Sequence, residues 1–129
     1  MDLGIRGRTA FVAAASRGLG RAIAEALAAE GVRVAVCARS EGIHAVAEEI
    51  AKAHGVETLG LVADVTVPAD ITRAVEATLK HFGAIDILVT NAGGPPAGPF
   101  ESHTPEAWQR ATALTLDPVV NLSVRCSLA

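Results

Sequence analysis

The sequence contains no tyrosine, and its 129 residues include only two lysines and two cysteines. Cys37 and Cys126 fit neither a disulfide framework nor the ligand spacing of a zinc site, so we expect no metal. No run approaches the ~20 apolar residues of a membrane-spanning helix, and the N-terminal MDLGIRGR has no apolar signal-peptide core. The formal net charge of −3 lacks the basic excess typical of nucleic-acid-binding proteins. We therefore expect a cytoplasmic protein that binds neither membrane nor nucleic acid.

Residues 1–129 are expected to form one domain, because half of them are hydrophobic and the length fits the usual ~100–200 residues. Short apolar runs rich in β-branched residues alternate with longer helical patterns. The predicted strands are Thr9–Ala13, Arg33–Ala38, Thr58–Ala63 and Ile85–Thr90. Strands separated by full helices run parallel. The pattern predicts an α/β fold, a Rossmann-like doubly wound parallel sheet in the order β-α-β-α-β-α-β-α.

The predicted helices carry ordinary start and stop signals. Ser40 is the expected cap of the second helix, and Pro68 occupies a first-turn position in the third. Gly31, Gly55 and Gly83 follow the first three helices, where a C-terminal glycine is favoured. The last helix is expected to open at 104–106 and to run toward the C-terminus.

The first predicted strand leads into the turn 14–20, Ala-Ala-Ser-Arg-Gly-Leu-Gly, at the start of a helix. Glycines at this place allow the backbone to approach a phosphate, which the free N–H groups and the helix dipole stabilise. Ser16 and Arg17 carry groups that can reach phosphate oxygens. Ser16 is equally well interpreted as a helix N-cap, and both roles are compatible.

Four motifs in this order carry a family resemblance: the turn within FVAAASRGLGR, Asp64-Val65, Asn91-Ala92-Gly93 and Glu106-Ala107-Trp108. The sequence resembles the short-chain dehydrogenase/reductase family, and within it the bacterial reductases similar to 3-oxoacyl-[acyl-carrier-protein] reductase. Ala13 and Ala14 stand where the family pattern has Thr and Gly. The resemblance implies an oxidoreductase that reduces a carbonyl by hydride transfer from NAD(P)H.

The resemblance also implies roles for single residues. Asp64 is expected to accept a hydrogen bond from the adenine amino group and Val65 to pack on the ring, although Asp64 also suits a simple turn. Asn91 is expected to tie the fourth strand to its neighbours. The predicted cofactor-binding residues are Ala14, Ser16, Arg17, Gly18, Leu19, Gly20, Arg39, Asp64, Val65, Asn91, Ala92 and Gly93.

The end of the second strand indicates which dinucleotide is bound. An acidic residue there would bind the ribose 2′-hydroxyl and repel a 2′-phosphate. The sequence instead reads Cys-Ala-Arg-Ser at 37–40, with Arg39 at the ~20-residue spacing expected for this position. Arg39 and Arg17 could hold a 2′-phosphate between them, so we predict NADP(H) in preference to NAD(H). The alternative is that Arg39 is a solvated loop residue.

By resemblance, catalysis requires a tyrosine, a lysine four residues later, a serine, and an asparagine in the last helix. The chain has no tyrosine, its lysines Lys52 and Lys80 lie on earlier helices, and Thr115 stands at the asparagine position. We therefore expect a truncated form of the family fold: a cofactor-binding N-terminal half, without the catalytic segment, that binds the dinucleotide without turnover. A regulatory pseudoenzyme that self-associates is the alternative.

The last helix is the expected contact in a homo-oligomer. By resemblance this helix packs against a partner subunit, and Trp108, Thr115 and Leu122 are the predicted contact residues. Pro118 is expected to interrupt the helix, because it removes one backbone N–H.

Overall fold

Four short parallel strands form the sheet of this protein. The computed structural model describes residues 1–128, and its strands are β1 (Thr9–Val12), β2 (Arg33–Ala38), β3 (Thr58–Val62) and β4 (Ile87–Val89). Their order across the sheet is β3-β2-β1-β4, with every neighbouring pair parallel. The predicted Rossmann-like α/β fold is confirmed. Three strands are shorter than predicted, β4 most of all, because only part of each apolar run is paired.

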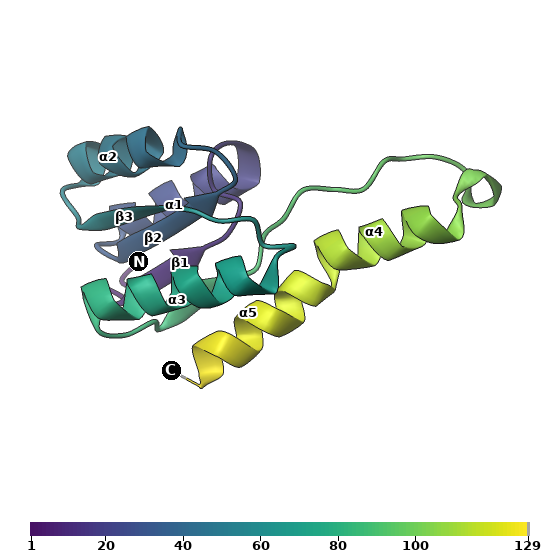
Figure 1. Ribbon diagram of the computed structural model, residues 1–129. Coiled ribbons are helices and arrows are strands. Elements are labelled where there is room, and N and C mark those ends of the chain that lie inside the picture. The colour runs from purple at the N-terminus through teal and green to yellow at the C-terminus, as the bar shows by residue number, and fades with distance from the viewer. Residues whose placement is uncertain (129) are drawn as a thin grey trace.

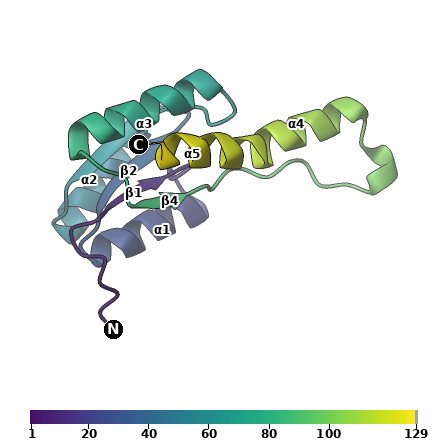
Figure 2. The same ribbon diagram turned by 90° about the horizontal axis from the view of Figure 1, so that it is seen from below.

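Helices cover both faces of the sheet (Figures 1 and 2). Ala10 and Val12 of β1 face the cluster formed with α1 (Gly18–Ala29) and α2 (Ile43–His54). Phe11 faces the opposite cluster, formed with α3 (Pro68–Phe82) and α5 (Asp117–Ser127). Successive side chains of a strand point to opposite faces, so one fully buried strand contributes to two cores.

The helix ends agree with the sequence at their C-termini and differ at two N-termini. Gly55 and Gly83 end α2 and α3 in the left-handed conformation, with φ of 66° and 86°. The predicted caps Ser16 and Ser40 are wrong. Arg17 precedes α1 with extended backbone, and Gly42 precedes α2, and neither helix has a side-chain capping bond. Ser40 instead contributes its backbone carbonyl to a turn, accepting from the N–H of Ile43 at 3.2 Å.

The predicted last helix is divided into two. α4 (Pro105–Thr115) ends at Leu116, and α5 begins at Asp117 with Pro118 in its first turn. This break confirms the expected effect of Pro118. α4 and the short 3₁₀ turn η1 (Phe100–Ser102) project from the body as an arm (Figure 1), and no residue of α4 is buried.

The prediction that Leu122 contacts a partner subunit is wrong. Trp108 and Thr115 are exposed, but Leu122 is fully buried in the chain's own core, in the cluster that includes Phe11 and Ile71. The physical reason is that α5 packs on α3 and β4. Leu122 is therefore unavailable to a partner.

We expect Leu122→Ala to lower the free energy of unfolding by about 2–5 kcal/mol, as for other buried leucines. Val119→Ala, on the same helix but exposed, is the matched control and should change it by well under 1 kcal/mol. Urea titration followed by circular dichroism measures both. Equal effects of the two substitutions would show that α5 does not dock on the sheet in solution.

Candidate functional site

The turn that follows β1 is bonded to both neighbouring strands. The N–H of Ala13 donates to the carbonyl of Val89 in β4 at 3.1 Å, and the N–H of Ala15 donates to the carbonyl of Cys37 in β2 at 3.0 Å. Cys37 is buried below the turn, and burial raises the pKa of its thiol to about 11. Its thiol is therefore protonated at neutral pH and acts as a small apolar side chain.

Within the turn, α1 approaches the strand end so closely that position 20 tolerates only glycine. A Cβ on Gly20 would overlap the carbonyl oxygen of Ala14 and lie 2.8 Å from Nδ2 of Asn91. That Nδ2 donates to the Ala14 carbonyl at 3.1 Å, linking the segment after β4 to the turn. Ala14 adopts φ of 51°, a left-handed conformation that is strained for a residue with a side chain.

These elements surround a pocket of about 590 Å³ at the carboxyl edge of the sheet. All of the predicted cofactor-binding residues line it except Gly20, which lies under the turn. Five further residues line it that the sequence interpretation missed, namely Ala38, Ala63, Thr66, Gly94 and Leu114. Four of them adjoin predicted positions, so proximity in sequence was an available signal. Leu114 comes from α4, and nothing in the sequence indicated it.

The pocket carries charges of both signs. Arg17 and Arg39 are exposed at its wall, and within residues 1–128 neither guanidinium forms an ion pair or a hydrogen bond. Asp64 Oδ1 accepts hydrogen bonds from the hydroxyl and the N–H of Thr66, at 2.7 and 2.9 Å. These bonds, and the charge of Arg39, hold the pKa of Asp64 below its usual range. Asp64 is therefore ionised at neutral pH and can act only as an acceptor.

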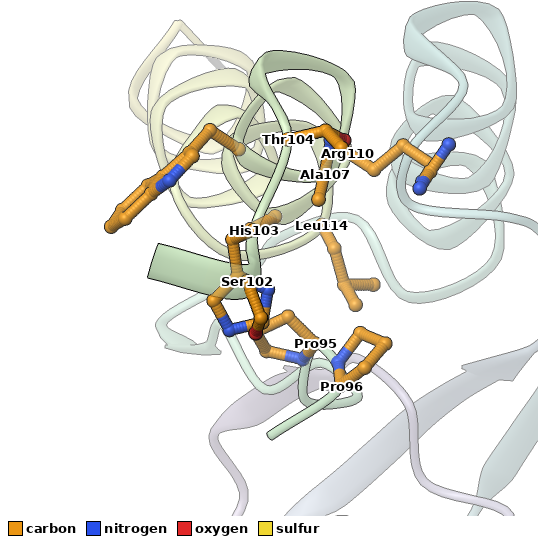
Figure 3. A pocket seen from close by; sticks show the side chains of 10 residues that line it. Pro95, Pro96, Ser102, His103, Thr104, Ala107, Arg110 and Leu114 are labelled. Carbon is orange, nitrogen blue, oxygen red and sulfur yellow. The ribbon is translucent and has the colours of Figure 1, made fainter. Parts of the chain in front are cut away.

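A second pocket, of about 600 Å³, lies between the 95–104 loop and α4 (Figure 3). Pro95, Pro96, Ala107 and Leu114 give it largely apolar walls, and His103 also lines it. Leu114 lines both pockets, so the two adjoin at this side chain. Apolar walls of this kind suit a hydrocarbon group.

Comparison with known proteins identifies the family. The sequence pattern of the short chain dehydrogenases matches residues 8–128. The chain belongs to the short-chain dehydrogenase/reductase family. Its members are oxidoreductases, and ketoreductases and dehydrogenases both occur among the relatives of this chain.

The chain is similar to relatives about twice its length. It is 38% identical over 122 residues to the 3-oxoacyl-[acyl-carrier-protein] reductase FabG of Escherichia coli K12, covering 94% of this chain and 48% of that protein. It is 42% identical over 105 residues to 1,6-dihydroxycyclohexa-2,4-diene-1-carboxylate dehydrogenase of Pseudomonas putida, covering 80% of this chain and 38% of that protein. The chain thus spans about half, or less, of these curated relatives.

Solved structures of the family superpose closely on this chain. L-Sorbose reductase from Gluconobacter frateurii, complexed with NADPH and L-sorbose, matches with a TM-score of 0.92 and 34% identity, over 98% of this chain and 48% of that one. Actinorhodin polyketide ketoreductase with NADPH matches with a TM-score of 0.86 and 34% identity, over 93% of this chain and 46% of that one. The agreement extends over nearly all of this chain and about half of each solved one.

Residues 1–128 contain no group of metal ligands and no helix suited to span a membrane. Among residues 1–128, no three His, Cys, Asp or Glu side chains group as metal ligands. Over the same range no helix combines the length and the apolar character that crossing a membrane requires.

Thr115, at the position predicted for the helix asparagine, donates its hydroxyl to the carbonyl of Ala111 at 2.6 Å. Its side chain therefore serves its own helix.

We expect Gly20→Ala to abolish dinucleotide binding and to destabilise the fold by about 1–3 kcal/mol, because the added methyl overlaps backbone that cannot move freely. Gly93→Ala is the matched control for stability, since its Cβ would meet no atom within 4 Å. Thermal unfolding without ligand compares the stabilities of the two variants. A Gly20→Ala protein as stable as Gly93→Ala would contradict the close approach of α1 to the turn.

Proposed function

We propose that this chain binds NADP(H) as the dinucleotide-binding part of a carbonyl reductase of the 3-oxoacyl type. One observation carries the proposal: the pocket brings the glycine turn together with Arg17 and Arg39, two arginines that have no partner within residues 1–128, and no acidic residue stands at the end of β2. FabG, at 38% identity, supports the substrate class, and the solved structures with NADPH support the cofactor.

The pocket residues fit such a dinucleotide. The close approach at Gly20 and the open backbone at Gly18 leave the N-terminus of α1 accessible to a pyrophosphate. Arg17 and Arg39 would bind the 2′-phosphate, Asp64 and Val65 the adenine, and the Asn91–Gly93 segment the ribose nearest the nicotinamide. When bound, NADPH supplies the hydride that reduces a carbonyl carbon. The residues of this chain hold and orient it.

We propose further that the 129 residues alone bind the dinucleotide without turnover. They contain no tyrosine to act as general acid, and Thr115 directs its hydroxyl into the helix. A regulatory, non-catalytic dinucleotide-binding protein is the second candidate, favoured by the same observations. An assay of NADPH oxidation with an acetoacetyl thioester decides whether the chain has activity of its own.

In a binding titration we expect the chain to prefer NADPH to NADH, and Arg39→Ala to weaken NADPH binding about tenfold or more without affecting NADH. Charge-assisted bonds to a phosphate contribute roughly 1.5–3 kcal/mol, and 1.4 kcal/mol is a factor of ten. Arg125→Ala, an exposed arginine on α5, is the control and should bind both ligands as the unaltered chain does. Tighter binding of NADH would overturn the NADP(H) assignment, and measurable NADPH oxidation would overturn the expected inactivity.

The chain is also proposed to self-associate through α4 and α5. Trp108, Leu116, Val120 and Val124 are all at least half exposed along these helices, and exposed apolar side chains grouped in this way are typical of an interaction surface. They replace Leu122 in the predicted contact.

We expect light scattering to show a dimer or larger species, and Val124→Asp to shift it toward monomer by placing a charge in the contact. Ser123→Asp adds the same charge at an exposed polar position of α5 and serves as control. A monomer at high protein concentration would contradict this proposal.

A further inference from the structure

The first turn of α3 holds the segment that leaves β3. Asp70 Oδ2 accepts a hydrogen bond from the backbone N–H of Asp64 at 2.8 Å. Asp70 Oδ1 accepts from Nη1 of Arg73 at 3.1 Å, and Nη2 of Arg73 donates to the carbonyl of Val62 at 2.8 Å. Two side chains of one helix therefore bind the backbone of Val62, the last residue of β3, and of Asp64, two positions beyond it.

Asp64, whose N–H Asp70 binds, is also the residue that offers a carboxylate oxygen to a ligand in the pocket. Oδ1 of Asp64 is occupied by the hydroxyl and the N–H of Thr66. Within residues 1–128, Oδ2 of Asp64 accepts no hydrogen bond, and Asp64 lines the dinucleotide pocket. Asp70 and Arg73 do not line it, so any effect of theirs on a ligand must act through Asp64.

We propose that Asp70, oriented by Arg73, is a positioning residue that fixes Asp64 for recognition of a base carrying an exocyclic amino group. This inference rests on the proposed function and adds to it the origin of base selectivity. A carboxylate oxygen accepts a hydrogen bond from the amino group of adenine and repels the carbonyl oxygen that hypoxanthine has at the same position.

The two contacts differ in strength. The Asp70 carboxyl is mostly buried, with 24% of its side chain exposed, whereas Arg73 is 61% exposed. A charged acceptor on a partly buried N–H is strong, but an exposed ion pair is weak. Asp70 therefore dominates, and Arg73 mainly restricts its rotamer. Without Asp70 the Asp64 segment would lose its preorganisation and would have to be ordered by the ligand.

The test compares NADPH with its hypoxanthine analogue, in which the adenine amino group is replaced by oxygen and N1 carries a proton. Dissociation constants are measured for the unaltered chain, Asp70→Ala and Asp70→Asn. The control is Glu76→Ala, which removes an exposed carboxylate of the same helix outside the pocket. Thermal unfolding without ligand is recorded for each variant.

We expect the unaltered chain and Glu76→Ala to bind NADPH about tenfold more tightly than the analogue, the factor that one charge-assisted hydrogen bond provides. Asp70→Ala should weaken NADPH binding about tenfold and reduce this ratio to about two or less. Asp70→Asn keeps an acceptor for the Asp64 N–H and should restore most of the ratio. Arg73→Met should lower it slightly.

Equal weakening of both ligands in Asp70→Ala, with the ratio retained, would mean a merely structural role and would overturn the inference. A ratio near one in the unaltered chain would overturn it as well. If the unaltered chain binds neither ligand, the proposed function itself is wrong, which is a separate result. If Asp70→Ala does not fold, Asp70→Leu, which fills a similar space without an acceptor for the Asp64 N–H, takes its place, and a ratio retained in that variant overturns the inference.

Discussion

The contact between Gly20 and the Ala14 carbonyl is the constraint on which the site depends. It sets how closely α1 approaches the end of β1, and no side chain fits between them. The same carbonyl accepts the Asn91 amide, and the flanking N–H groups bond to β2 and β4. The turn therefore fixes the floor of the pocket and the positions of the two neighbouring strand ends together. Strain at Ala14 is tolerated because these bonds hold it in place.

Parallel strands place the chemistry of distant sequence positions at one edge. Arg39, Asp64 and Asn91 each follow a different strand, and all three line the same pocket. The sheet order β3-β2-β1-β4 then arranges them in space: Asp64 lies at the outer strand, Arg39 beside the turn, and Asn91 on the other side. Arg39 and Asp64 follow neighbouring strands, and the charge of Arg39 lowers the pKa of Asp64, so the two opposite charges lie on the same side of the pocket and the uncharged Asn91 lies on the other.

Sequence reasoning succeeded where one local signal decides the structure and failed where packing decides it. The strand–turn–helix pattern and the glycines after α2 and α3 suffice to predict the fold, and the motifs suffice to predict the pocket wall. The predicted caps at Ser16 and Ser40 were wrong because α1 begins directly after the extended Arg17 and α2 directly after Gly42, and neither helix has a side-chain capping bond. The prediction that Leu122 contacts a partner subunit was wrong because helical periodicity reveals an apolar face but not whether α3 or a partner covers it. Leu114 depends on the path of the arm, which no local signal encodes.

The arm connects the two proposed properties of the molecule. α4 has no buried residue, yet its Leu114 lines the pocket and its Trp108 belongs to the exposed apolar surface. An association that immobilised α4 would also hold Leu114 against the pocket, and a ligand that ordered Leu114 would favour the associated form. Such coupling is reciprocal by thermodynamic necessity. The coupling free energy acts through the single side chain of Leu114, which joins the two surfaces. The geometry makes this coupling favourable, and its size depends on how freely the arm moves without a partner.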